Sequence, residues 1–196
     1  VDIFEWQDSD GYQSAFDKAF QKIGSLPTIG IEGQRMRVFE SQAIEKAANK
    51  IKIINAHKLI SRIRLTKNVE EIEKLKKAID IAEKSLEKTL QYVEVGKTEI
   101  EIKNFLIQQL YNYGAEGIAF GPIVLASDNS ALPHGHSRND YKIKKGDCLL
   151  FDFGAIVDGY NSDITRTFFI ESVSEEYKNI YQAVYNANAI GLKISK

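Results

Sequence analysis

The chain has 196 residues, and its 26 basic and 27 acidic side chains give a formal net charge of −1, which argues against a nucleic-acid partner. Apolar residues make up 43% and charged residues 27%, a balance that is typical of soluble globular proteins and excludes disordered and collagen-like chains. The single cysteine, Cys148, excludes an internal disulfide, and no apolar run approaches the length of a membrane span. We therefore expect a cytoplasmic protein with no membrane partner.

Short strands and helices alternate in the first part of the chain. A brief apolar strand is predicted at 29–31, a helix at 36–48 and an isoleucine-rich strand at 50–55. Such alternation is typical of α/β architecture. The segment is too short for a complete domain of this kind. Residues 1–60 are therefore interpreted as the C-terminal part of a small α/β domain, and residues 61–68 as a linker.

Two amphipathic helices are predicted after the linker. Apolar residues recur every three or four positions over 69–93, which places one apolar stripe on a helix and lysine and glutamate on its other side. Thr98 and Glu101 form a capping box, which predicts that a second helix begins there and continues to about Tyr113. The charged side of the first helix is interpreted as solvated surface.

The pattern then changes to strands. An apolar run at 120–126 predicts a buried strand, and a polar loop follows at 127–141. The segments 148–157 and 160–170 read as strands on either side of Asp158–Gly159, which is the strongest short-range signal for a hairpin. A final helix is predicted towards the C-terminus.

The two-residue turn sets the register of the hairpin. It places Asp152 opposite Thr165 and Gly154 opposite Asp163, and alternation puts all four on one polar face. Diagonal neighbours across two strands lie about 7–8 Å apart at the backbone, so the two carboxylates can converge on one point. A divalent cation such as manganese or magnesium would then relieve their repulsion. The alternative is a solvated polar face on which the two aspartates never meet.

His134 is a candidate for acid–base chemistry. It lies in the sequence Leu-Pro-His-Gly, where proline and glycine restrict the backbone on both sides and suit a side chain held in one direction. A surface histidine is the alternative. His136 and His57 have no such neighbours and are interpreted as ordinary histidines, and Cys148 is interpreted as a buried structural thiol at the start of a strand.

A resemblance to a known family rests on two stretches, GIAFGPIVLASDNSALPHG and KKGDCLLFDFGAIVDGYNSDITRTFFI. They resemble the first half of the catalytic domain of the proline-specific metallopeptidases of the pita-bread family, which are the Xaa-Pro dipeptidases (prolidases) and the Xaa-Pro aminopeptidases. The resemblance implies an α+β fold. A partial pita-bread domain, similar to those of creatinase and the aminopeptidases, would occupy 69–196, preceded by the tail of an α/β N-terminal domain.

Carried over residue by residue, the resemblance makes Asp152 and Asp163 ligands of two divalent metal ions, manganese foremost, with cobalt or zinc as alternatives. Thr165 would support the metal shell, which agrees with its position opposite Asp152. His134 would assist at the scissile carbonyl, and Phe120 would line the proline-side pocket. The implied reaction is attack by a metal-bridged hydroxide on the bond before proline, in a dipeptide or at a peptide N-terminus. The family also suggests a homodimer.

The resemblance implies further metal ligands that these residues do not supply. In the family a histidine and two glutamates downstream of the second aspartate complete the site, whereas no histidine follows His136 here. Together with the first residue, Val1, this predicts an excerpt of a longer enzyme that is inactive by itself. Two other functions stay open, a non-catalytic pita-bread binding or scaffolding protein and a creatinase-like hydrolase without metal, although the two aspartates count against both. The sequence does not separate a dipeptidase from an aminopeptidase.

Overall fold

The chain divides into two compact units. The computed structural model describes residues 1–48 and 51–195, and the units are Val1–Lys67 and Asn68–Lys196. Residues up to Leu65 of the segment expected as a linker belong to helix α3 (His57–Leu65), so most of that segment is helical.

The first unit contains α1 (Gln13–Ile23), β1 (Thr28–Ile31), α2 (Val38–Ala47), β2 (Lys52–Asn55) and α3. β1 and β2 pair in parallel, and α2 connects them, which is the α/β alternation that the sequence predicts. Ala15 and Phe20 of α1 are buried, as are Ala43 and Ile44 of α2. The sequence does not predict α1, and Lys50, where the second strand is expected to begin, lies outside the described residues.

Two capped helices open the second unit, α4 (Val69–Leu90) and α5 (Glu99–Asn112). At the start of α5 the Thr98 hydroxyl accepts a 3.2 Å hydrogen bond from the Glu101 backbone N–H, and the Glu101 carboxylate accepts one of 2.7 Å from the Thr98 N–H. These reciprocal bonds satisfy donors that a helix start otherwise leaves unpaired, as the sequence predicts.

Two small sheets follow the helices. Their strands are β3 (Gly117–Ile118), β4 (Ile123–Ala126), β5 (Cys148–Phe153), β6 (Ala155–Val157), β7 (Tyr160–Asn161) and β8 (Ile164–Phe169). β4, β5 and β8 form one antiparallel sheet, and β3, β6 and β7 form the other. The 3-10 helix η1 (Ser127–Ala131) follows β4 within the predicted polar loop. Phe120, which the sequence places in the buried strand, precedes β4 and is not part of it.

The predicted register of the hairpin is confirmed. Asp152 pairs with Thr165 in the ladder between β5 and β8, and Val157 pairs with Tyr160 beside the turn. The turn residues Asp158–Gly159 have φ angles of 48° and 78°. Two successive left-handed residues make the type I′ turn whose twist matches that of the flanking strands.

Each arm of the hairpin is interrupted, because Gly154 and Ser162 meet at its centre. A Cβ atom on Gly154 would lie 1.8 Å from the Ser162 carbonyl oxygen, so only glycine fits there. The Ser162 hydroxyl donates a 3.1 Å hydrogen bond to the Ala78 carbonyl in α4 and accepts one of 3.0 Å from the Ala155 N–H. This close crossing divides the two predicted strands into four and ties the hairpin to α4.

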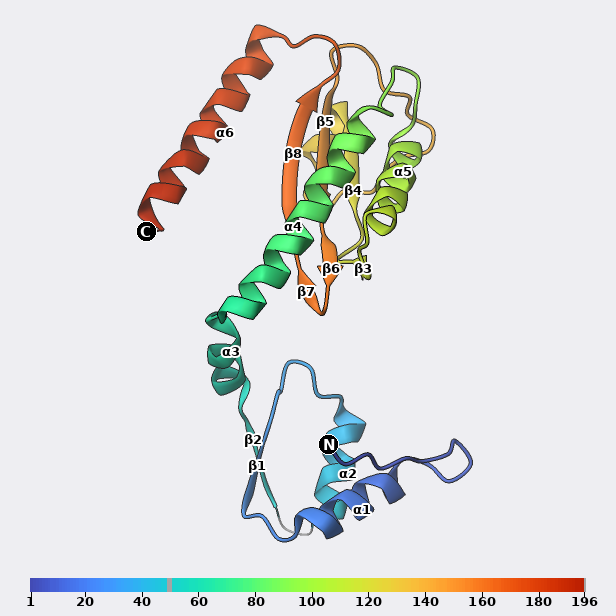
Figure 1. Cartoon of the computed structure of the whole chain (residues 1–196), viewed down its shortest axis with the longest axis vertical. Helices are drawn as coiled ribbons and strands as arrows, with labels where there is room; N and C mark the ends of the chain where they lie inside the picture. The colour runs from blue at the N-terminus through green and yellow to red at the C-terminus, as the bar shows by residue number, and fades with distance from the viewer. Residues whose placement is uncertain (49–50, 196) are drawn as a thin grey trace. The chain divides into compact units, whose positions relative to one another are not determined.

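The core lies between the helices α4 and α5 and one face of the β4–β5–β8 sheet (Figure 1). It is apolar, and its members from these elements include Ala78, Ile81, Ala82, Ile102, Leu106, Leu110, Val124, Leu149, Phe151 and Phe153. Because side chains alternate along a strand, Ile123, Asp152 and Thr165 point to the opposite face. The helices therefore leave that face of the sheet available for a site.

The last helix, α6 (Glu175–Ile194), begins after Ser174, whose hydroxyl accepts a 3.2 Å hydrogen bond from the Tyr177 N–H. Tyr177 and Tyr181 contact Phe169 at the end of β8, with ring centroids 6.0 and 6.1 Å apart. No described residue of α6 is buried, and its exposed apolar side chains include Ile180, Val184, Tyr185, Ile190 and Leu192. Within the described ranges, no helix is both long and apolar enough to cross a membrane.

Candidate active site

A pocket of about 320 Å³ opens on the sheet face opposite α4 and α5. Three adjacent strands contribute Ile123, Asp152 and Thr165, which the ladders place side by side. The rest of the lining comes from the same sheet face and from the segment after β4, namely Leu125, Leu150, Ser130, Ala131, Leu132, Pro133 and His134. The pocket is therefore mainly apolar, and it brings together a carboxylate, a hydroxyl and an imidazole, the type of lining expected of a small-molecule site.

The Asp152 carboxylate is oriented by its neighbour across the ladder. The Thr165 hydroxyl donates a 2.8 Å hydrogen bond to Asp152 Oδ1. No described residue donates a hydrogen bond to Oδ2, and the Asp152 side chain is half-buried at the pocket wall. One carboxylate oxygen is thus fixed while the other is open to a ligand.

Asp163 is the second predicted metal ligand, and it lies outside the pocket lining. It is exposed and directly precedes β8, two positions before Thr165 and on the same face of the hairpin. Carboxylate oxygens suit hard divalent ions, and the two aspartates together fit part of such a site. Among the residues that the structure describes, no group of three or more histidine, cysteine, aspartate or glutamate side chains could hold a metal ion.

His134 lines the pocket from a tight turn. The Gly135 N–H donates a 3.1 Å hydrogen bond to the Leu132 carbonyl, with Pro133 as the second residue of the turn and His134 as the third. His134 has a φ of 55°, as the third residue of a type II turn requires. A left-handed conformation costs a residue other than glycine about 1–2 kcal/mol, so surrounding contacts must stabilise this turn.

The structure does not bring the remaining candidate to the pocket. Phe120 is half-buried in the segment between β3 and β4 and is not part of the pocket lining. Of the two histidines interpreted as ordinary, His136 is exposed and His57 lies in the first unit. Cys148, which the sequence places among buried residues, is only half-buried, and its sulfur lies 3.0 Å from the Ser130 hydroxyl.

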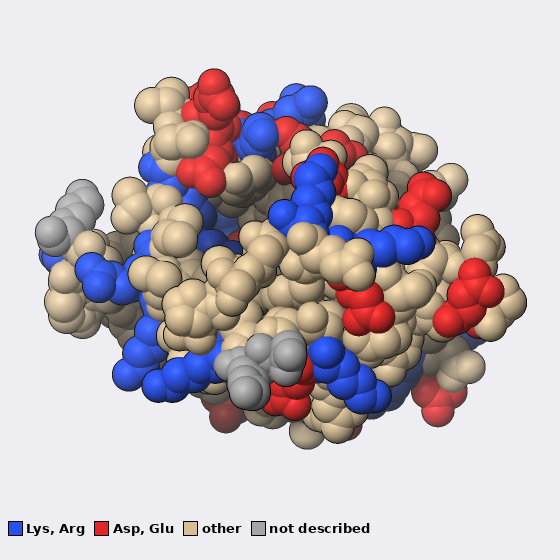
Figure 2. Space-filling model, turned by 90° about the horizontal axis from the view of Figure 1, so that it is seen from below, with Lys and Arg blue, Asp and Glu red and all other residues tan. Residues whose placement is uncertain are grey.

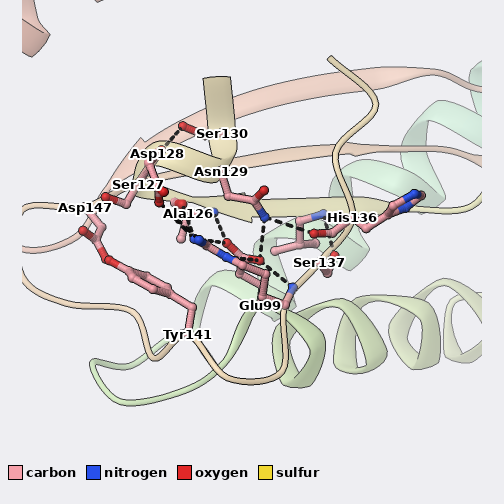
Figure 3. Close-up of polar contacts among 12 residues, drawn as sticks. Glu99, Ala126, Ser127, Asp128, Asn129, Ser130, His136, Ser137, Tyr141 and Asp147 are labelled. Atoms are coloured by element: carbon pink, nitrogen blue, oxygen red, sulfur yellow. Dashed lines mark hydrogen bonds and ion pairs between the residues drawn. The ribbon is translucent and has the colours of Figure 1, made fainter. Parts of the chain in front are cut away.

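Glu99, the first residue of α5, is a charged group of the site region that the sequence does not reveal. Its side chain is fully buried, and its carboxylate accepts hydrogen bonds from the backbone N–H groups of Ala126 and Arg138 and from the Asn129 amide (Figure 3). Acidic residues are common in the first turn of any helix, so its sequence position carries no signal of burial.

Arg138 pairs with this buried carboxylate and is itself held from several sides. Its guanidinium lies 3.1 Å from a Glu99 oxygen and 3.2 Å from Asp128, and it stacks on the Tyr141 ring at 4.3 Å from the centroid. Partial burial lowers the pKa of Arg138, but the hydrogen bonds and charges of Glu99 and Asp128 outweigh it, so the net pKa is raised. The guanidinium therefore stays charged beside Glu99.

Charges of both signs occur on the molecular surface. Figure 2 shows lysine and arginine side chains together with aspartate and glutamate side chains on the same face, in keeping with the net charge of −1. A neutral balance of this kind provides no long-range attraction for a polyanion.

Residues 73–196 match the model of metallopeptidase family M24. The chain is 33% identical over 185 residues to the Xaa-Pro dipeptidase of Pyrococcus furiosus, which covers 92% of this chain and 51% of that protein. It is also 32% identical over 180 residues to the Xaa-Pro dipeptidase of Pyrococcus horikoshii, and this match covers 92% of this chain and 51% of that protein. The chain spans about half the length of the curated relatives that it matches.

Solved structures share the fold. The X-Pro aminopeptidase of Thermotoga maritima MSB8 matches with a TM-score of 0.84 and 33% identity, over 96% of this chain and 53% of that one. The prolidase of Pyrococcus furiosus matches with a TM-score of 0.78 and 32% identity, over 88% of this chain and 50% of that one. The expected partial pita-bread fold of mixed helices and strands is thereby confirmed, and the chain belongs to the metallopeptidase family M24.

Proposed function

We propose that the intact protein hydrolyses the peptide bond that precedes proline, in Xaa-Pro dipeptides or at peptide N-termini, with the help of divalent metal ions. The observation that carries this proposal is the pocket on the open sheet face, whose lining includes both His134 and the oriented carboxylate of Asp152. Similarity to an Xaa-Pro dipeptidase and to an X-Pro aminopeptidase supports the choice of substrate class.

In this proposal Asp152 and Asp163 hold two divalent ions together with ligands outside these 196 residues. Manganese is the first choice because both side chains offer hard oxygen donors, and cobalt and zinc are alternatives. When bound, the ions supply a nucleophilic water at neutral pH and offset the negative charge of the transition state. Two carboxylates alone bind two metal ions only weakly. Residues 1–196 by themselves are therefore expected to bind metal weakly and to lack peptidase activity.

The chain's own residues would orient the substrate and move a proton. Thr165 holds the Asp152 carboxylate in one orientation through its 2.8 Å hydrogen bond. The His134 imidazole, at the pocket wall, would face the scissile carbonyl and either transfer a proton or stabilise the oxyanion. The apolar residues of the sheet face would shield the reacting bond from water, and Phe120 would contact the proline ring from the segment before β4.

The proposal is tested with the purified intact protein on matched dipeptides. After removal of metal with a chelator, the rate on an Xaa-Pro dipeptide should be lost and should return with manganese, while the matching Xaa-Ala dipeptide should stay intact. The same comparison with cobalt and zinc identifies the metal, and a tripeptide that begins with Xaa-Pro separates an aminopeptidase from a dipeptidase. Metal binding without hydrolysis of any of these peptides would favour a scaffolding protein, and hydrolysis that survives metal removal would favour a creatinase-like reaction.

A further inference from the structure

The buried carboxylate of Glu99 joins two segments that lie far apart in the sequence from α5. Its Oε1 atom accepts hydrogen bonds from the Ala126 N–H at 2.7 Å and from Arg138 Nη2 at 3.1 Å. Its Oε2 atom accepts from the Asn129 side-chain amide at 2.9 Å and from the Arg138 N–H at 2.6 Å. In Figure 3, Ala126 and Asn129 lie above Glu99, and dashed lines mark these hydrogen bonds. Both carboxylate oxygens are therefore fully used.

These partners are the two stems of the loop that carries His134. Ala126 and Asn129 precede it, and Arg138 follows it. The stems also bind each other, because the Asn129 amide donates a 3.0 Å hydrogen bond to the His136 carbonyl and Arg138 Nη2 donates one of 3.0 Å to the Ala126 carbonyl. The segment between them, residues 130–135, forms one side of the pocket and contains the turn of His134.

This arrangement answers two physical requirements. A buried carboxylate is stable only when charges and hydrogen bonds replace its water, and Glu99 obtains these from Arg138, from N–H donors and from its place in the first turn of α5. The left-handed backbone of His134 is unfavourable by itself and persists only where neighbouring structure imposes it. Tying both stems to one rigid helix end supplies that constraint.

We propose that Glu99 is a positioning residue for the reaction: by binding both stems of the loop, it holds the His134 imidazole at the pocket wall that also contains Asp152. The role in catalysis rests on the proposed function, whereas the effect on the loop does not. Glu99 touches no pocket residue by a hydrogen bond of its own, and it acts through Arg138 and Asn129.

Because both oxygens of Glu99 accept hydrogen bonds, glutamine cannot replace it without the loss of some of these bonds. In Glu99→Gln the amide nitrogen must occupy one of the two oxygen positions. At the first it faces the Ala126 N–H and Arg138 Nη2, and at the second it faces the Asn129 amide and the Arg138 N–H. Each arrangement opposes donors to a donor, so each stem loses one of its hydrogen bonds to residue 99 whichever way the amide turns.

The effect on the loop is measured by hydrogen exchange in the intact protein. Glu99→Gln should speed amide exchange over residues 130–136 by about tenfold or more, and Glu101→Gln, on the same helix, should leave it unchanged. Arg138→Lys is a milder second variant, because it keeps the charge and the backbone N–H but loses the guanidinium bonds; it should shift exchange in the same direction by less. Unchanged exchange in both Glu99→Gln and Arg138→Lys would overturn the proposal.

The effect on catalysis is measured with a double-mutant cycle on an Xaa-Pro dipeptide. Glu99→Gln should lower kcat by about tenfold with little change in KM. In the His134→Ala background the same substitution should not lower kcat further, because the imidazole through which Glu99 acts is already absent. Equal losses of kcat in both backgrounds would show a structural role only and would overturn positioning while leaving the proposed function intact. If His134→Ala itself left kcat unchanged, the proposed role of His134 would fail, and the positioning role with it.

Discussion

The Thr165 hydroxyl and the Asp152 carboxylate face each other across β8 and β5 and are joined by a 2.8 Å hydrogen bond. The bond fixes Oδ1 of the aspartate, so that Oδ2 is the oxygen available to a ligand. Hydrogen bonds of this kind orient a metal ligand and commonly contribute 10- to 100-fold, in round terms, to metal affinity or activity.

Removal of that hydroxyl is the first prediction. Thr165→Val should weaken metal binding to the intact protein or lower its activity by roughly tenfold or more, because the Asp152 side chain then rotates freely. Thr167→Val is the matched control: Thr167 lies on the same strand and face and pairs with Leu150, so it has no carboxylate opposite it. Calorimetric titration with manganese and a rate measurement would check both variants, and equal values for them would contradict the role assigned to Thr165.

The turn at His134 predicts a trade between stability and activity. His134→Gly should raise the free energy of unfolding by about 1 kcal/mol, since glycine adopts a φ of 55° without strain. It should also lower kcat by about 10²-fold or more, because the imidazole is lost. Urea unfolding and dipeptide kinetics measure the two quantities. A variant that is both less stable and fully active would show that the side chain packs rather than reacts.

The crossing at the centre of the hairpin predicts a strong effect of one methyl group. Gly154→Ala should destabilise the protein by about 3 kcal/mol or more, because the new Cβ would lie 1.8 Å from the Ser162 carbonyl oxygen and the backbone must separate. Gly121→Ala is the control, since a Cβ there meets nothing within 4 Å. Thermal unfolding of the two variants provides the comparison, and similar melting temperatures would refute the close crossing.

The hairpin tip predicts a loss of stability in acid. Lys74 lies 2.5 Å from Asp158, and its hydrogen bond and charge hold the pKa of the Asp158 carboxyl below the usual 3.8. Because the folded-state pKa is the lower one, the stabilisation is complete well above pH 3.8 and disappears as the pH falls through the folded-state value. Lys74→Met should remove this pH-dependent contribution to the free energy of unfolding, which is measured by urea unfolding at pH 7 and pH 3. Asp158→Asn gives an Asn-Gly sequence, which favours the same type I′ turn. In that background Lys74→Met should have no pH-dependent effect on stability.

The pairing of Asp152 with Thr165 follows from local rules. A two-residue turn at Asp158–Gly159 fixes the register, and the period of two along a strand then determines that Asp152 and Thr165 share a face. These two inferences require no knowledge of the rest of the fold. They place the carboxylate and its hydroxyl partner correctly, and the ladder confirms them.

Other features could not be predicted, because they depend on contacts between distant residues. Glu99 and Arg138 are 39 positions apart, and nothing in either segment shows that they pair. The interruption at Gly154 arises from the close approach of the Ser162 carbonyl, which a hairpin pattern does not reveal. The presence of His134 in the pocket lining likewise depends on the path of a polar loop, and this loop has no periodic pattern from which its path could be predicted.

The most direct test of the account is a paired substitution in the intact protein, Asp163→Asn and Asp80→Asn. Asp80 is a control because it lies on exposed α4 surface, where its partner is Lys84. Bound manganese and the rate of hydrolysis of an Xaa-Pro dipeptide should both be lost in Asp163→Asn and retained in Asp80→Asn, since only the first change removes a proposed metal ligand. Full activity and an unchanged metal content in Asp163→Asn would contradict the assignment of a metal-dependent proline-specific peptidase.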